Sequence, residues 1–235
     1  RDDVESRGLG DVYKRQIFSC NRTEDVLMDE NIRKRNECLA QTVIRGLQSR
    51  NMSGYYAANK EEAKKQALEL IPEGSRIAMG GCMSAHEIGL IEALEAGNYN
   101  YIDRSKLDAR AGLMAAYDAD VFLSSANAIT SDGIMVNIDG NSNRVSCIAQ
   151  GPRKVVFIVG LNKVCDDLDG AMKRARNVAA PCNAQRFDIK TPCKETGKCF
   201  DCKSPDTICC QFLITRYSRH TDRIHVILVN ENLGF

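Results

Sequence analysis

Short apolar segments alternate with helical segments from Arg76 onward, and this alternation constrains the fold more than any other feature of the chain. The predicted strands lie at 76–79, 99–103 and 119–124, and the predicted helices between them at 84–96 and 105–117. Strands that are joined through helices in this rhythm form parallel βαβ units. The chain is therefore predicted to be an α/β protein, with a mostly parallel, Rossmann-like sheet flanked by helices.

Further segments extend the pattern on both sides. A long polar helix is predicted at 24–50, a short strand at 55–58, and a helix that Asn59 caps and that ends before Pro72. Ser84 and Glu87 have the spacing of a second capping box, at the start of the helix at 84–96. Later in the chain we expect a β-hairpin from 133–139 and 144–150, a buried strand at 154–160, a helix at 166–179 that stops at Pro181, and a last strand at 223–229.

The chain contains no internal repeat and no low-complexity linker, which favours a single domain over residues 17–235. A cysteine-rich segment at 182–210 is predicted to be an insertion into that domain. Residues 1–16 do not continue the strand and helix patterns, and they resemble translated adapter sequence left at the ends of environmental gene fragments. We therefore exclude them from the fold prediction.

Composition argues against several classes of protein. The 32 basic and 31 acidic residues leave a formal charge of +1, so no electrostatic footprint for nucleic acid is present. No apolar run approaches the roughly 18 residues that would span a bilayer, and membrane insertion is not expected. The 11 cysteines are odd in number and follow no evident signal peptide, which favours a reducing, cytoplasmic setting over a secreted disulfide scaffold.

Four of these cysteines, Cys193, Cys199, Cys202 and Cys209, lie in a polar segment that could not bury a core of its own. Their C-x5-C-x2-C-x6-C spacing allows all four thiolates to turn toward one tetrahedral zinc ion or one [4Fe-4S] cluster. Reduced thiols without a ligand are the alternative, because cysteine is often buried for packing alone. Cys182 and Cys210 are nearby spares.

A second constellation follows the ends of three predicted strands. In open α/β sheets ligands bind at the carboxyl ends of the strands, where small and polar residues let a ligand approach the backbone. The segments after these strands supply the following candidate ligand-binding residues: Gly80, Gly81, Ser84, Asn127, Thr130, Asp132, Gly133, Asn162 and Lys163. We expect this rim to hold a small anionic ligand, although each residue alone is equally explained by a turn or a solvated surface.

His86 and Asp132 are weak catalytic candidates. A histidine titrates near neutral pH and can act as a general base, but a histidine on a helix surface is commonly without a role. Asp132 precedes Gly133 and is explained equally well by an Asp-Gly turn. The chain has no G-x-G-x-x-G, no G-x-x-x-x-G-K-[ST] and no H-E-x-x-H, so these nucleotide and zinc-protease motifs are absent.

Several segments together resemble the LUD (lactate utilisation) domain family. They are GGCMSAHEIG (80–89), AITSDGIMVNIDGNSNRV (128–145), GPRKVVFIVGLNKV (151–164), ARNVAAPCNAQR (175–186) and the cysteine segment. The resemblance implies a fold similar to the sugar-phosphate isomerase and CoA-transferase superfold. It also implies a part in oxidising L-lactate to pyruvate together with iron–sulfur partner subunits, and this redox setting favours a cluster over zinc.

Two other classes of function stay open beside this one. The chain could be a ligase- or transferase-like enzyme acting on a phosphorylated or CoA-linked small molecule. It could also be a non-catalytic assembly subunit that holds a structural metal. The ferredoxin run C-x2-C-x2-C-x3-C-P of larger iron–sulfur subunits is absent.

Overall fold

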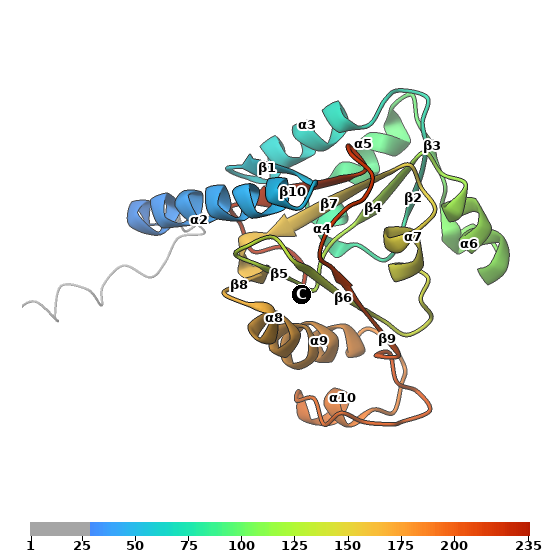
Figure 1. The fold of residues 1–235 in the computed structure, drawn as a ribbon. Coiled ribbons are helices and arrows are strands. Elements are labelled where there is room, and N and C mark those ends of the chain that lie inside the picture. Colours follow the sequence, from blue (N-terminus) through green and yellow to red (C-terminus); the bar gives the residue numbers. More distant parts are fainter. Residues whose placement is uncertain (1–28) are drawn as a thin grey trace, which may run out of the picture.

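A computed structural model describes residues 29–235, so the adapter-like leader and the first residues of the helix predicted at 24–50 lie outside the described part. The helices are α2 (Glu30–Ser49), α3 (Lys60–Leu70), α4 (Met83–Glu87), α5 (Leu90–Ala96), α6 (Ala109–Tyr117), α7 (Val145–Ala149), α8 (Leu168–Arg174), α9 (Ala180–Ala184) and α10 (Pro192–Thr196). The strands are β1 (Ser53–Ala57), β2 (Arg76–Met79), β3 (Asn100–Tyr101), β4 (Val121–Ser124), β5 (Ala128–Thr130), β6 (Met135–Asp139), β7 (Lys154–Gly160), β8 (Val164–Cys165), β9 (Gln211–Thr215) and β10 (Ile224–Val229). Figure 1 shows their arrangement.

Six strands form an all-parallel sheet in the order β1-β10-β7-β4-β2-β3. The predicted α/β class and the mostly parallel sheet are therefore confirmed. A second, mixed sheet in the order β8-β5-β6-β9 lies below the first in Figure 1 and was not predicted. Its strand β9 comes from the chain after the cysteine segment and pairs antiparallel with β6, so Gln211 lies opposite Asp139.

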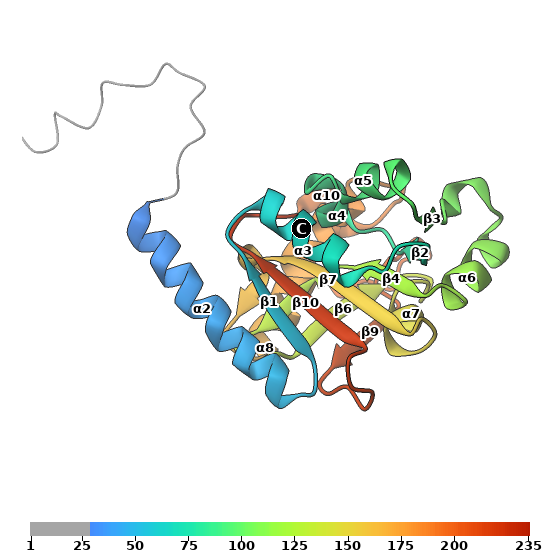
Figure 2. The same cartoon turned by 90° about the horizontal axis from the view of Figure 1, so that it is seen from above.

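Helices cover both faces of the parallel sheet because its central strands are apolar on both sides. Val156 and Ile158 of β7 pack on one face with α3, α4 and α5. The alternate residues Val155 and Phe157 pack on the other face, with α2, α7 and residues of the second sheet. Figure 2 shows α2 running beside β1, while α3 and α5 lie over the sheet. A third, smaller core fixes the second sheet to α8.

Local capping interactions explain where the first helices begin. The carboxylate of Asp29 accepts hydrogen bonds from the backbone of Asn31 and Ile32 at the start of α2. Asn59 accepts from the backbone N–H of Glu62, and the Glu62 carboxylate accepts from the N–H of Ala58. The predicted cap at Asn59 is thus confirmed.

Three local predictions that concern residues 84–150 were wrong. Ser84 does not cap a helix but lies buried inside α4, which begins at Met83, and the helix is broken at Gly89 (φ 67°) before α5. Residues 145–149 form helix α7 rather than the second strand of a hairpin, because β6 pairs with β5 and β9 instead. The carboxylate of Asp139 accepts hydrogen bonds from the backbone of Arg144 and Val145 and turns the chain into that helix.

The helix that was predicted to stop at Pro181 continues through it. A π-helical turn, Ala175–Ala179, joins α8 to α9 and ends just before the proline. Proline lacks an N–H and its ring crowds the carbonyl four residues earlier, and a widened turn relieves that conflict. None of the helices in the described part of the chain is long and apolar enough to cross a membrane.

Candidate functional site

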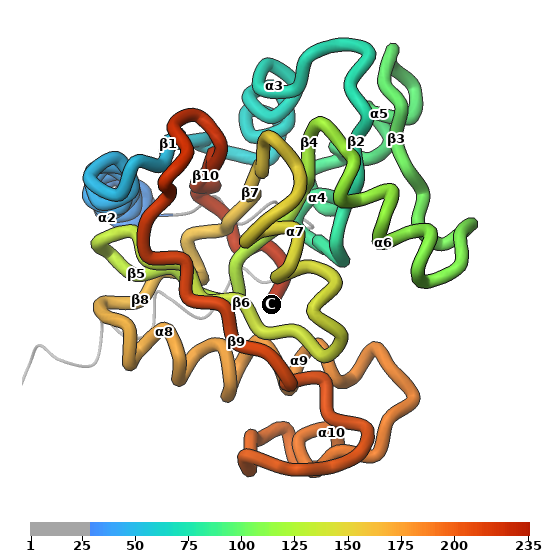
Figure 3. The backbone as a smooth tube through the Cα atoms, turned by 45° about the vertical axis from the view of Figure 1, so that its right-hand side comes forward, coloured from blue at the N-terminus to red at the C-terminus, as the bar shows by residue number. Residues whose placement is uncertain are grey.

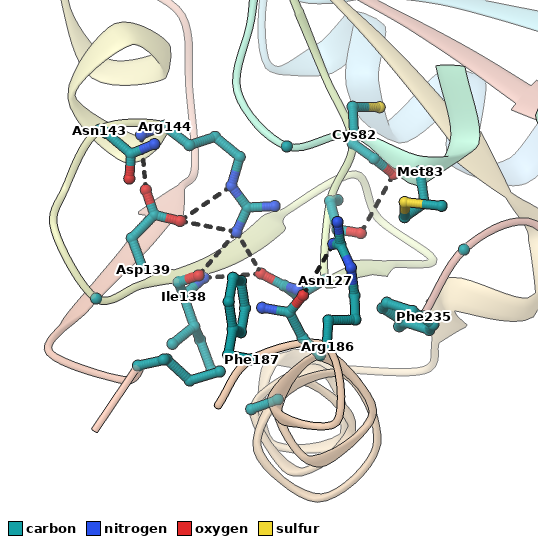
Figure 4. Close-up of a pocket in the computed structure, with 18 of the residues that line it drawn as sticks. Cys82, Met83, Asn127, Ile138, Asp139, Asn143, Arg144, Arg186, Phe187 and Phe235 are labelled. Atoms are coloured by element: carbon teal, nitrogen blue, oxygen red, sulfur yellow. Dashed lines mark hydrogen bonds and ion pairs between the residues drawn. The ribbon is translucent and has the colours of Figure 1, made fainter. Parts of the chain in front are cut away.

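A cavity of about 470 Å³ opens at the carboxyl ends of the central parallel strands. Residues after β2, β4, β7 and β10 reach it, since parallel neighbours end at the same edge of a sheet. Segments of the second sheet, the turn that precedes α7, and α9 complete the wall, and Figure 4 shows their side chains around the cavity. The polar lining residues include Gly81, Cys82, Ser84, Ser125, Asn127, Asp139, Asn143, Arg144, Lys163, Asn183, Arg186 and Gly234.

Lys163 is the buried cation of this cavity. Its side chain is 3% exposed, and its Nζ lies 3.0 Å from Ser125 Oγ and 3.5 Å from Ser84 Oγ. Among the described residues no carboxylate forms an ion pair with it. Burial therefore lowers the pKa of Lys163 to about 8, and the nearby guanidinium groups of Arg174 and Arg144 lower it as well.

One serine is positioned by the end of a strand and the other by a helix. Ser125 follows β4 directly and is 5% exposed, while Ser84 lies on α4 and is completely buried. Their hydroxyl oxygens are 3.5 Å apart, so Ser84, Ser125 and Lys163 form a triangle of contacts. The backbone of Gly234 passes close to this triangle, and a Cβ there would lie 3.2 Å from Lys163 Nζ.

Arg144 forms a second cationic group in the wall. Its Nε donates to Asp139 Oδ1 at 3.0 Å, and its Nη2 donates to Asn127 Oδ1 and to the carbonyl of Ile138. Its Nη1 has no hydrogen bond within the described part of the chain. The ion pair with Asp139 is largely buried, so the carboxylate neutralises Arg144 and holds its guanidinium beside the cavity (Figure 4).

Arg186 lies between the aromatic rings of Phe187 and Phe235 in Figure 4. The Arg186 guanidinium lies 5.8 Å from the ring centre of Phe187, and its Nη1 donates to Asn183. Lys163, Arg144 and Arg186 outnumber Asp139 among the charged lining residues, so the cavity has a net positive charge. A cavity of this size and charge suits an organic anion.

The structure brings together five of the predicted rim residues. Gly81, Ser84, Asn127 and Lys163 line the cavity, and Gly80 lies directly behind it. A Cβ on Gly80 would come within 2.9 Å of the Arg144 side chain, whereas a Cβ on Gly81 would meet nothing within 4 Å. Gly80 thus makes room for Arg144, and Gly81 leaves open space for a ligand.

Thr130, Asp132 and Gly133 do not reach the cavity. Thr130 ends β5, and Asp132 and Gly133 lie in the turn between β5 and β6. Asp132 pairs with Arg50, the residue after α2, and accepts a hydrogen bond from Thr130. Gly133 (φ 89°) lies against the backbone of Gly46 and Leu47. The predicted ligand-binding and catalytic roles of this turn find no support in its position, since its polar groups fasten the second sheet to α2.

Two other predicted residues also lie outside the lining. The side chain of Asn162 contacts the backbone of Leu233 and holds the last segment against β7. His86 is exposed on α4 and contacts no residue of the cavity floor. Neither position supports a direct role with the bound molecule.

Sequence reasoning missed Cys82, Ser125, Arg144 and Arg186. Ser125 could have been found, because it directly follows the strand that was predicted at 119–124. Arg144 could not, since its place depends on the pairing of β6 with β5 and on the turn at Asp139. Arg186 lies just after α9, and the predicted helix at 166–179 ended before α9 begins.

The four predicted cysteine ligands line a second, smaller cavity of about 60 Å³. Figure 3 shows this part of the chain, α10 and the loop after it, below α9 and away from the parallel sheet. The thiols are close enough to interact: burial, and then the neighbouring thiols of Cys193, Cys199 and Cys202, raise the pKa of Cys209 to about 11. Within the described residues no group of three or more side chains already has the geometry of a metal centre.

Cys199 has a basic and a polar neighbour. Arg176 Nη2 donates to its sulfur at 3.7 Å, and the backbone N–H of Asp201 donates at 3.5 Å. The Asp201 carboxylate holds the same guanidinium at 2.6 Å. Both contacts fix the position of the Cys199 sulfur in the cavity wall. The spare cysteines Cys182 and Cys210 are exposed and do not line this cavity.

The two cavities adjoin each other. Ala180 of α9 and Ile208 of the cysteine segment line both of them. A metal centre held by the cysteines would therefore be separated from a molecule in the larger cavity by these two apolar residues.

The fold and the site define a class of protein: an α/β protein with a parallel sheet, a cationic cavity at the strand ends and four cysteines around a second cavity. The LUD domain model matches residues 40–229, and the chain belongs to this family. A crystal structure of a DUF162 family protein from Deinococcus radiodurans is similar to it, with 12% identity, 84% of this chain and 98% of that chain covered, and a TM-score of 0.47. Comparison with curated proteins gives no match.

Proposed function

We propose that this LUD protein takes part in the oxidation of L-lactate or a related 2-hydroxy acid to the 2-oxo acid. It binds an organic anion in the cavity at Lys163 and holds a metal centre on Cys193, Cys199, Cys202 and Cys209. The observation that carries the proposal is the shared wall: Ala180 and Ile208 separate the anion cavity from the four thiols. A redox centre this close to a substrate can exchange electrons with it.

The cysteine cavity offers thiols, the donors that both a cluster and a zinc ion take. The four thiols would have to draw together around the metal, since no group among the described residues already has that geometry. Four thiols face one small space, and two N–H donors already contact Cys199. A [4Fe-4S] cluster would supply one-electron chemistry there, whereas zinc would be structural, because it does not change oxidation state. Electrons would leave through an iron–sulfur oxidoreductase partner subunit, since the chain has no fingerprint of a nicotinamide site.

The chain's own residues provide the charge for binding. Lys163 and Arg186 attract the carboxylate of the acid, and the amide of Asn127 and the hydroxyls of Ser84 and Ser125 offer hydrogen bonds to its other oxygens. Phe187 and Ile208 cover the apolar side and exclude water. The positive charge of the lining therefore favours an organic acid over a neutral molecule.

A second candidate is a transferase-like enzyme on a phosphorylated or CoA-linked compound. The cavity volume of about 470 Å³ favours it, because a three-carbon acid would leave most of that space empty. In that case the cysteines would hold a structural metal.

Protein purified without oxygen tests the proposal. We expect iron, sulfide and a broad visible absorption, and an electron paramagnetic resonance spectrum of the reduced protein that changes when pyruvate is added, because the cavities adjoin. Zinc with no iron would favour the structural metal and the transferase. Iron with a spectrum that pyruvate leaves unchanged would argue against a ligand next to the cluster.

A further inference from the structure

The floor of the larger cavity contains a serine and a lysine arranged in a way that anion binding alone does not require. Ser125 Oγ lies 3.0 Å from Lys163 Nζ, which is hydrogen-bond distance between a hydroxyl and an amine. Ser84 Oγ lies 3.5 Å from both of these atoms. A nucleophile beside a base, with the base oriented by a third group, is the arrangement that activates a serine, and Ser–Lys pairs are one of its forms.

We propose that Ser125 is a nucleophile and Lys163 its general base, with Ser84 positioning Lys163, so that the cavity carries out acyl transfer on anionic acyl compounds. This inference rests on the anion-binding cavity of the proposed function and names a substrate class for it. The suitable substrates are esters, thioesters or acyl phosphates whose acid or leaving group carries a carboxylate or phosphate.

The step is balanced without any added reactant except the acceptor. Neutral Lys163 takes the proton of the Ser125 hydroxyl while Ser125 Oγ bonds to the carbonyl carbon. The bond from that carbon to the leaving oxygen or sulfur breaks, and the leaving group takes the proton from Lys163. Water or a second hydroxyl or thiol then attacks the acyl-serine, and its proton returns through Lys163 to Ser125.

The surroundings of Lys163 support this role. A general base must lose its proton near neutral pH, and burial lowers the pKa of Lys163 to about 8. The charged and titratable groups that act on it are Cys82 before α4, Glu87 on α4, Arg144 before α7 and Arg174 at the end of α8. The two arginines favour the neutral amine, while a Cys82 thiolate and Glu87 oppose them.

Charge on the cavity wall selects the substrate. Arg186 is not neutralised by a carboxylate in the described part of the chain, and Arg144 keeps its Nη1 without a hydrogen bond. Negative charge that develops on the carbonyl oxygen is stabilised in such surroundings. An acyl compound that bears an anionic group gains binding energy that a neutral ester lacks.

Covalent labelling with a fluorophosphonate tests the nucleophile directly. Ser125 Oγ attacks phosphorus and fluoride leaves, so we expect one adduct per chain and its location at Ser125 by peptide mapping. S125A removes the adduct. Lys163→Met and Lys163→Arg slow labelling at least 100-fold, and the arginine variant keeps the charge but cannot serve as a base. The matched controls Ser131→Ala and Lys173→Met, which change residues outside the cavity lining, label at the normal rate.

The pH profile and an ester pair separate catalysis from packing. Labelling of the unchanged protein should rise with a midpoint near pH 8, and Ser84→Ala should move that midpoint downward, because the ammonium loses a hydroxyl partner. After subtraction of the release without protein, the release of 4-nitrophenol from 4-nitrophenyl 4-carboxybenzoate, whose carboxylate cannot reach its own ester, should be at least tenfold faster than from 4-nitrophenyl benzoate.

Labelling at another residue such as Cys82, or equal rates for Lys163→Arg and the unchanged protein, would overturn the inference. Pyruvate binding, measured by calorimetry on the same preparation, distinguishes this failure from that of the proposed function. Bound pyruvate without Ser125 labelling overturns acyl transfer alone. Absence of both overturns the anion cavity as well.

Discussion

Lys163, the proposed anchor for the anion, lowers the stability of the fold, because its ammonium is buried and no carboxylate among the described residues pairs with it. Replacing it with Met should weaken pyruvate binding by about 1–3 kcal/mol, the range for a lost hydrogen bond to a charged group. Binding to the unchanged protein should also weaken as the pH rises through about 8, where Lys163 loses its charge. Calorimetric titrations with pyruvate measure both effects, and Lys173→Met serves as the control. Equal affinity of Lys163→Met and the unchanged protein would exclude Lys163 as an anchor.

The same substitution should stabilise the fold at neutral pH. The pKa of Lys163 is lowered to about 8 in the folded protein, so below pH 8 both states hold the proton and the full cost of burying the charge is present. Between pH 8 and the ordinary value of 10.5 only the unfolded state holds it, and stability rises with pH. The two pKa values differ by about 2.5, and at about 1.4 kcal/mol for each pKa unit this difference corresponds to a free-energy cost of roughly 3 kcal/mol.

Urea denaturation at several pH values checks this sign. Lys163→Met should be more stable than the unchanged protein by up to that amount at pH 7, and the gain should shrink as the pH approaches 10. A gain that grows with pH would contradict the assignment. Subtracting the unfolding free energies of the two proteins at each pH cancels the contributions of other groups that titrate in this range.

Sequence reasoning located Lys163, Ser84 and Asn127 because strand ends of a parallel sheet meet at one edge. It could not locate Arg144, whose position depends on contacts between the two sheets. Asp132 was misplaced for the same reason. An Asp-Gly pair after a strand fits a ligand loop and a turn equally well, and only the contact with Arg50, the residue after α2, distinguishes them.

At the scale of elements, the contact between α2 and the turn after β5 is so close that a Gly-to-Ala substitution in this helix should destabilise the protein instead of stabilising it. Gly46→Ala replaces a poor helix former with the best one, which ordinarily adds up to about 1 kcal/mol. Here the new Cβ would lie 2.3 Å from the carbonyl carbon of Asp132, so the turn must move. We expect a loss of about 1–3 kcal/mol, as for an overpacked core.

Gly112→Ala in α6 is the matched control. Its Cβ would meet only the Arg104 side chain, at 3.6 Å, which is an ordinary contact. This variant should be more stable by about 0.5–1 kcal/mol. Chemical denaturation of both variants measures the two signs, and a stabilising Gly46→Ala would show that the turn is not packed against α2.

The elements with strong local signals were predicted well, and those that depend on distant partners were not. Strand β7 was predicted with its observed bounds, because its apolar run is continuous. Strand β9 was missed because it is largely exposed and forms only by pairing with β6, which lies far away in sequence. The π-helical turn before Pro181 also escaped prediction, since a proline ordinarily marks the end of a helix.

At the scale of the molecule, the cysteine segment is attached to the fold at its two ends. Helix α9 leads into this segment and strand β9 leads out of it. The two large buried cores belong to the parallel sheet and its helices. The apolar side chains Phe200 and Phe212 line the cysteine cavity but remain exposed. Apolar burial therefore contributes little to this segment, and a bound metal would be its main source of stability.

Replacing Cys202 with Ser should release the metal and loosen residues 192–210, because three thiols bind a tetrahedral centre less well than four. The parallel sheet should stay folded on its own apolar strands. Metal analysis measures the release, and hydrogen–deuterium exchange should rise in the cysteine segment while β7 and β10 remain protected. Cys38→Ser, which changes an exposed thiol on α2, is the control and should keep its metal. A Cys202→Ser protein with full metal content, or an unchanged protein purified without oxygen that contains neither iron nor zinc, would reject the centre. Loss of protection across the whole sheet would instead show that the segment and the core unfold as one unit.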